Sequence, residues 1–167
     1  MKRVISKILI FILVLAAVGL TACSRFVISK PPASAELEKK LNDRFQDFVT
    51  VRDYLLNLDH DHAWISAHLD NDLTRFHADF GYHDIQDEEV IQAVKRLNDI
   101  GCSEIDKDLE NNCVYFELWW SSQDIGCGVL YRIDREKEPQ VQFMTELKET
   151  GHEAWYTYMT DYNEWRK

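Results

Sequence analysis

Apolar residues recur every three or four positions between residues 35 and 58, which is the spacing of one face of an α-helix. The residues of this stripe are Leu37, Leu41, Phe45, Phe48, Val51 or Arg52, and Leu55. Ser34 stands just before the stripe and belongs to the residue types that cap helix N-termini. The pattern predicts one long amphipathic helix over residues 35–58.

A second helical stripe lies in the segment DIQDEEVIQAVKRLNDIG, residues 84–101. We expect Asp84 to cap this helix and Gly101 to end it, with acidic residues in the first turn, where the helix dipole favours negative charge. The apolar face consists of Val90, Ile91, Val94 and Leu97.

After Gly101 the apolar period changes to two, which is typical of β-strands. CVYFELWW and IGCGVLYRI, separated by four residues, predict a β-hairpin. The expected partners on its apolar face are Val114 with Tyr131, Phe116 with Val129, Leu118 with Cys127, and Trp120 with Ile125. On the other face, Trp119 and Glu117 should lie over Gly126 and Gly128, where the missing side chains leave room for the indole.

Further strands are expected at VQFMTEL and AWYTYMT, with weaker ones near 63–69 and 103–106. The whole pattern therefore predicts an α+β fold, a mostly antiparallel sheet packed on one face by two helices.

The first twenty residues have the pattern of an export signal. Lys2, Arg3 and Lys7 give it a positive start, no acidic residue occurs before Glu36, and residues 8–20 are an uninterrupted apolar stretch of thirteen. A membrane-spanning helix needs about 20 such residues, so the stretch fits a signal peptide better than a transmembrane helix.

The four residues Leu20-Thr21-Ala22-Cys23 resemble the lipobox of bacterial lipoproteins. The resemblance implies a lipid on the thiol of Cys23 and removal of residues 1–22 as a lipoprotein signal peptide. It also implies anchoring at the cell membrane or outer membrane, on the extracytoplasmic side. In that family, Ser24 at the second mature position is compatible with sorting to an outer membrane.

Residues 23–33 are expected to form a tether, because Pro31 and Pro32 disfavour both helix and sheet. Eleven fully extended residues span about 35–40 Å, so the tether holds the rest of the chain close to the membrane. Residues 34–167 have the length of a single domain.

The expected domain is strongly acidic. Five of the 19 lysines and arginines precede Ser34 and all 29 acidic residues follow it, which leaves 14 basic and 29 acidic residues and a net charge of −15. This charge repels phosphate backbones and anionic lipid, so nucleic acid is disfavoured as a partner. A basic partner is permitted.

The order of elements and the segments FQDFVTVRDYLL, DEEVIQAVKRL and GVLYRI resemble small secreted bacterial lipoproteins of unassigned function. The resemblance covers most of the mature chain. It implies the fold and carries no activity.

Five of the six histidines fall between residues 60 and 83, amid many aspartates. His60, His62 and His68 would share a face of an extended segment and could hold Zn²⁺ or Cu²⁺, although their spacing matches no zinc signature. The simpler interpretation is histidines on a polar connector, and no metal site is assigned. Asp70, Asn71 and Asp72 are contiguous and cannot wrap a calcium ion as alternating ligands do.

The C-terminal half is rich in aromatic residues that could stack on cell-wall sugars, although core packing accounts for at least half of them. They are Trp119, Trp155, Tyr156, Tyr158, Tyr162 and Trp165. The chain contains no nucleophile, P-loop or dinucleotide motif, so we expect no cofactor and no catalytic residue.

Cys102, Cys113 and Cys127 remain after the anchor cysteine. Because disulfides persist outside the cytoplasm, a Cys102–Cys113 bridge and three reduced thiols are both open. Cys127 is expected on the buried face of the hairpin and Cys113 on the other, so those two should not pair.

These observations favour a membrane-anchored, non-catalytic lipoprotein of the cell envelope that binds a macromolecular partner. An inhibitor or immunity protein against a basic toxin or wall hydrolase is one concrete version. The alternative is an enzyme or a solute or metal binder with a pocket between the helices and the sheet.

Overall fold

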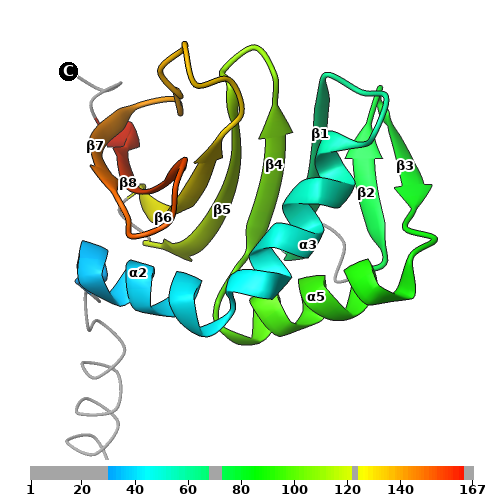
Figure 1. Cartoon of the computed structure of the whole chain (residues 1–167), viewed down its shortest axis with the longest axis horizontal. Coiled ribbons are helices and arrows are strands. Elements are labelled where there is room, and N and C mark those ends of the chain that lie inside the picture. Colours follow the sequence, from blue (N-terminus) through cyan, green and yellow to red (C-terminus); the bar gives the residue numbers. More distant parts are fainter. Residues whose placement is uncertain (1–29, 68–72, 122–123, 164–167) are drawn as a thin grey trace, which may run out of the picture. The chain divides into compact units, whose positions relative to one another are not determined.

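The computed structural model describes residues 30–67, 73–121 and 124–163, and residues 31–167 form one compact unit. The described helices are α2 (Ser34–Asp43), α3 (Phe45–Leu56) and α5 (Glu88–Asp99). The described strands are β1 (His62–Ser66), β2 (Arg75–Ala78), β3 (Gly81–Asp84), β4 (Glu104–Asp108), β5 (Cys113–Trp120), β6 (Ile125–Arg132), β7 (Met144–Glu149) and β8 (Trp155–Asp161). The fold is α+β, as the sequence predicts (Figure 1).

One antiparallel sheet contains all eight strands of the described residues, in the order β3-β2-β1-β4-β5-β6-β8-β7. α3 packs against α5, and α2 contacts β6 and β8 (Figure 1). The three helices share one apolar core with residues from one face of the sheet. Its large, fully buried side chains include Leu41, Phe48, Leu55, Leu97, Phe116 and Trp155.

The predicted helix over 35–58 is interrupted at Arg44, whose φ of −130° and ψ of 23° are not helical. The apolar stripe nevertheless continues across the break, since Leu41 and Phe48 on either side are both fully buried. Periodicity alone therefore gives no sign that this segment forms two helices. The prediction of a single helix here was wrong.

The expected caps of both helices are shifted. Ala33, not Ser34, occupies the N-cap of α2, and the Ser34 hydroxyl donates to Glu146 Oε1 of β7 at 3.0 Å. At α5 the cap is Asp87, whose carboxylate accepts the backbone N–H groups of Glu89 and Val90.

Asp84 cannot serve as that cap because it ends strand β3. There it pairs with Arg75 of β2, whose Nε lies 2.9 Å from Asp84 Oδ1. The predicted apolar face of α5 is confirmed, since Val90, Ile91, Val94 and Leu97 are all buried. Gly101, with φ of +98°, follows the end of the helix.

The β5–β6 hairpin has the predicted register over half of its length. Val114 lies opposite Tyr131 and Phe116 opposite Val129, as expected. The register then shifts between Glu117 and Trp119. Beyond this bulge, Trp119 is opposite Cys127 and Trp120 is opposite Gly126, so the predicted Leu118–Cys127 and Trp120–Ile125 pairs do not form.

The bulge brings Trp120, in place of Trp119, beside Gly126. A Cβ atom on Gly126 would lie 2.9 Å from Trp120 Cε3. Gly126 therefore does leave room for an indole, as predicted, but the indole is that of Trp120 and not that of Trp119. Trp119 instead packs against the helix-side core.

Strands β2 and β3 occupy part of the segment that we expected to be a polar connector. They form a hairpin joined by Asp79 and Phe80, with φ values of 47° and 65°. Such turns favour Asn-Gly or Asp-Gly, so Asp-Phe gives little signal in the sequence. Burial of Phe76 and Ala78 against the core stabilises the hairpin.

A second, smaller apolar cluster lies on the face of the sheet away from the helices. It consists of Cys113, Leu130, Tyr156 and Tyr158, with Tyr115, Val141, Met144 and Leu147 packed around it. Strands β5 to β8 form a strongly curved half of the sheet (Figure 1). This curvature encloses side chains that an open, flat sheet would expose to water.

Candidate functional site

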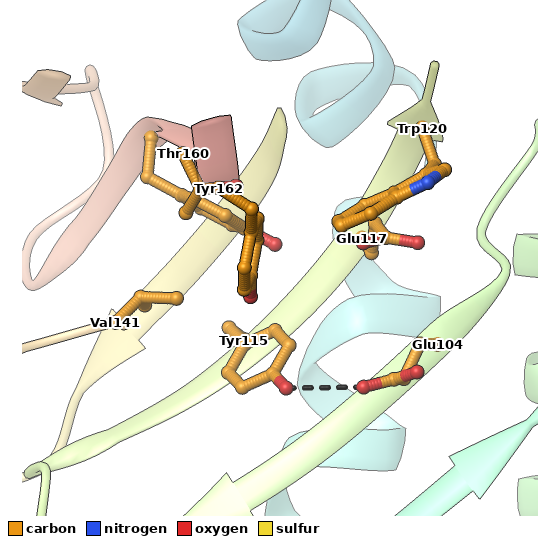
Figure 2. A pocket seen from close by; sticks show the side chains of 8 residues that line it. Glu104, Tyr115, Glu117, Trp120, Val141, Thr160 and Tyr162 are labelled. Atoms are coloured by element: carbon orange, nitrogen blue, oxygen red, sulfur yellow. Dashed lines mark hydrogen bonds between the residues drawn. The ribbon is translucent and has the colours of Figure 1, made fainter. Parts of the chain in front are cut away.

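A cavity of about 280 Å³ opens beside this second cluster, with Tyr115 and Glu104 on one side and Thr160 and Tyr162 on the other (Figure 2). The residues that line it are Glu104, Tyr115, Glu117, Trp120, Val141, Tyr158, Thr160 and Tyr162. Within the described part of the chain, the lining has two carboxylates, several aromatic rings and no lysine, arginine or histidine.

The alternation of β4 explains why acidic side chains gather here. Ile105 and Lys107 point toward the helices, where the Lys107 Nζ donates to the Leu58 carbonyl oxygen at 2.9 Å. Glu104 and Asp106 therefore point to the opposite face. In the register with β5, Glu104 is the direct partner of Glu117.

Two hydroxyl groups donate to these carboxylates. The Tyr115 hydroxyl lies 3.1 Å from Glu104 Oε1 and 3.1 Å from Asp106 Oδ2, so it connects the two acidic residues. The Ser103 hydroxyl donates to Glu117 Oε1 at 2.7 Å. Burial and the neighbouring Asp106 and Glu104 raise the pKa of Tyr115, which keeps this hydroxyl protonated as a donor.

Aromatic rings form the other walls of the cavity. The ring centroids of Trp120 and Tyr162 are 5.1 Å apart, and those of Tyr115 and Tyr158 are 6.0 Å apart. Phe143 supports Tyr162 from outside the lining, with a centroid distance of 5.0 Å. Trp120 is 42 % exposed and stands at the open rim.

Asp106 is a third acidic side chain on this face of the sheet, and it lies on the side toward β1. His62 Nε2 forms a hydrogen bond with Asp106 Oδ2 at 3.1 Å, and the Asp106 residue is only 7 % exposed. Burial raises the pKa of Asp106 to about 7, although His62 and the Tyr115 hydroxyl act in the opposite direction. The chain His62–Asp106–Tyr115–Glu104 therefore joins a solvent-facing imidazole to the cavity.

Two of the histidines that the sequence proposed as metal ligands lie beside different carboxylates. His60 Nδ1 lies 2.6 Å from Asp79 Oδ2, whereas His62 pairs with Asp106. His68 and the candidate calcium ligands, residues 70–72, lie outside the described residues. Among residues 30–67, 73–121 and 124–163, no group of three or more histidine, cysteine or acidic side chains could hold a metal ion.

The structure does not contain the Cys102–Cys113 bridge. Cys102, Cys113 and Cys127 are free thiols, and all three are buried. Cys102 and Cys127 belong to the helix-side core, while Cys113 belongs to the cluster on the other face, so the sheet separates it from both. The predicted faces of Cys113 and Cys127 are those found.

The predicted aromatic set divides between the two faces. Trp155 is 2 % exposed and packs with Phe48 and Phe116 in the helix-side core, away from this cavity. Tyr158 and Tyr162 line the cavity. Tyr156 is buried in the second cluster, and Trp165 lies outside the described residues.

Sequence reasoning did not identify Glu104, Tyr115 and Trp120 as site residues. The alternation of β5 contains the signal for Tyr115, which stands between Val114 and Phe116 of the apolar face. For Glu104 the signal is weaker, since only Ile105 on one side of it belongs to that face. Trp120 reaches the site only because of the bulge after Glu117, which no periodicity indicates.

Comparison of the chain with protein-family models, with curated protein sequences and with solved structures finds no match. In the part of the chain that the structure describes, no helix has the length and apolar character needed to cross a bilayer.

Proposed function

We propose that this protein is a lipid-anchored, extracytoplasmic binding protein of the cell envelope, without a catalytic role, and that its sheet face binds a basic macromolecule. The lipobox-like segment ending at Cys23 supports the anchor. The acidic cavity supports the choice of partner.

The observation that carries the proposal is the composition of the cavity wall. Glu104 and Glu117 face it together, and its described lining contains no basic side chain. The segment from Ser34 onward also has a net charge of −15, so a positively charged partner is attracted over a distance before it makes contact.

The short tether favours a partner that is itself at the cell surface. The tether of eleven residues keeps the domain within about 35–40 Å of the membrane. This raises the local concentration of the binding domain around a partner at the cell surface. An inhibitor or immunity protein against a basic toxin or wall hydrolase is the concrete form of this proposal.

The test is capture of partners by the full-length protein, in detergent, from envelope extracts at about 50 mM and about 500 mM salt, since exposed charges are screened at the higher concentration. We expect one basic protein that binds at low salt and is released at high salt. A Glu104→Gln/Glu117→Gln variant should lose it, while Glu110→Gln, on the exposed β4–β5 turn, should retain it. Absence of any partner at both concentrations would overturn the proposal.

The competing candidate is an enzyme or solute binder, and one observation favours it. Asp106 has a pKa of about 7 and connects through Tyr115 to the cavity, and perturbed carboxyl groups of this kind recur at sites of proton transfer. Thermal-shift measurements with wall fragments, metal ions and small metabolites test it. A rise in the unfolding temperature by several degrees with one of these would favour this candidate.

A further inference from the structure

We infer that the β2–β3 turn is the centre of a protein-docking surface, in which Phe80 enters an apolar pocket of the partner and the acidic residues beside it face basic residues at the rim of that pocket. The inference deepens the proposed function and rests on it only for the kind of partner, a basic protein. It assigns a contact away from the cavity. Glu104 begins β4 and Trp120 ends β5, whereas the β2–β3 turn lies at the end of the sheet where β4 ends and β5 begins.

Phe80 is exposed to solvent on all sides. The residue is fully exposed, whereas Phe48, Phe76 and Phe116 are buried in the helix-side core. A phenylalanine in this position gives the fold no burial of apolar surface, while the cores of protein interfaces are enriched in aromatic residues. Its ring is therefore presented to a partner.

The backbone of the turn is unfavourable for a phenylalanine. Asp79 and Phe80 have φ values of 47° and 65°, in the left-handed region. Two-residue hairpin turns of this kind favour glycine or asparagine, and a bulky residue there is rare because its Cβ atom crowds the backbone. An aromatic residue in a conformation that costs the fold, with no burial in return, points to a role outside the fold.

The turn is held in place by its neighbours. Asp79 Oδ2 lies 2.6 Å from His60 Nδ1, in the α3–β1 connection. Within the hairpin, His83 stacks on the buried Phe76 with a centroid distance of 5.1 Å, and its Nε2 lies 3.3 Å from the Ala78 carbonyl oxygen. A contact residue that is ordered before it binds loses little conformational entropy on binding.

Three exposed acidic residues lie on the two segments beside Phe80. The α3–β1 connection and the β2–β3 turn share the upper end of the sheet in Figure 1, and together they carry Asp59, Asp61 and Asp79. Lys107 of the adjacent β4 is only 1 % exposed and its Nζ donates to the Leu58 carbonyl oxygen, so it is not presented to a partner. Anionic lipid and a second copy of this acidic domain are both repelled here, whereas basic residues around an apolar pocket are attracted.

The experiment places the photo-cross-linking residue p-benzoyl-phenylalanine at position 80 of the full-length protein in its native membranes. We expect ultraviolet light to link this position to the basic protein of the proposed function, through a peptide in which lysine or arginine flanks apolar residues. The same probe in place of Lys39, which is exposed on α2, should form no such link. A link to lipid, to a second copy or to an acidic protein, or no link at all, would overturn the inference.

The affinity of the linked protein, once purified, is then measured for variants in detergent. Phe80→Ala should weaken binding about tenfold or more, because the central apolar contact is lost. Asp61→Asn should weaken it about threefold at low salt and reduce its salt dependence. Asp43→Asn removes the same charge from α2 and should leave the affinity unchanged. Undiminished affinity in Phe80→Ala would contradict the inference.

Stability gives a second measurement that requires no partner. Phe80→Gly creates the Asp-Gly pair that such turns favour, so the unfolding temperature should rise by about 2–4 °C. Circular dichroism of the full-length protein in detergent measures it. A lower unfolding temperature would show that Phe80 serves the fold, and the inference would then be wrong.

The outcomes for the inference and for the proposed function are separable. If a basic partner is lost by the Glu104→Gln/Glu117→Gln variant but binds Phe80→Ala with undiminished affinity, the inference fails and the proposed function stands. If the partner linked at position 80 binds the double variant with undiminished affinity but binds Phe80→Ala weakly, the cavity is not its site and the docking surface remains.

Discussion

Asp106 is a buried carboxyl group held between a half-exposed imidazole and a tyrosine hydroxyl. Its pKa of about 7 lies above the ordinary 3.8, so the folded chain binds this proton more tightly than the unfolded chain does. The contribution of Asp106 to the free energy of unfolding is therefore greatest below about pH 4 and is lost as the pH rises to about 7.

We expect Asp106→Asn, which cannot ionise, to gain stability relative to the wild type over that interval. The free energy of unfolding of the variant, minus that of the wild type, should rise by about 2–4 kcal/mol between about pH 4 and pH 8. Urea unfolding at several pH values measures it, with the exposed Asp43→Asn as the control. A difference that stays constant with pH would contradict the assigned cause.

At the scale of elements, replacement of either glycine of β6 by alanine should destabilise the fold, but by different amounts. A Cβ on Gly128 would lie 1.9 Å from the Phe116 carbonyl oxygen, which is backbone and cannot move without disturbing β5. A Cβ on Gly126 would meet side chains instead, Thr160 Oγ1 at 2.8 Å and Trp120 Cε3 at 2.9 Å, and the Trp120 indole is 42 % exposed.

Gly128→Ala should therefore lower the free energy of unfolding by about 3 kcal/mol or more, and Gly126→Ala by about 1 kcal/mol. Gly126→Ala should also change the tryptophan emission, because it displaces Trp120. Chemical denaturation with fluorescence detection measures both effects. Gly151→Ala is the control and should be nearly neutral, because among the described residues a Cβ there would meet Glu38 Oε1 alone, at an ordinary contact distance of 3.5 Å.

The helix α5 and the first half of the β5–β6 hairpin could be predicted because burial on one face repeats through each of them. The break at Arg44 and the bulge after Glu117 could not, since apolar residues continue across both. The cavity depends on that bulge and on pairing between strands distant in the sequence. The strand pattern therefore does not predict that its acidic and aromatic residues lie together. The β2–β3 hairpin escaped prediction because Asp79-Phe80 lacks the usual turn residues.

At the scale of the whole molecule, the lipid anchor makes a prediction independent of the fold. Cys23→Ser removes the thiol that the lipobox resemblance assigns to lipid attachment. The variant should incorporate no labelled fatty acid and should accumulate as uncleaved or unlipidated protein. Metabolic labelling measures this, with the buried Cys113→Ala as a control that keeps its label. Label in the serine variant would contradict the resemblance.

The burial of free thiols on both sides of the sheet has a kinetic consequence. Burial raises the pKa of Cys113 and of Cys127 to about 12, so both are neutral as well as inaccessible in the folded state. Such a thiol reacts with an alkylating agent only while the chain around it is open. Cys127 therefore records openings of the helix-side layer and Cys113 records openings of the opposite layer. Equal rates would mean that the two layers open together, and unequal rates that one layer opens more often than the other.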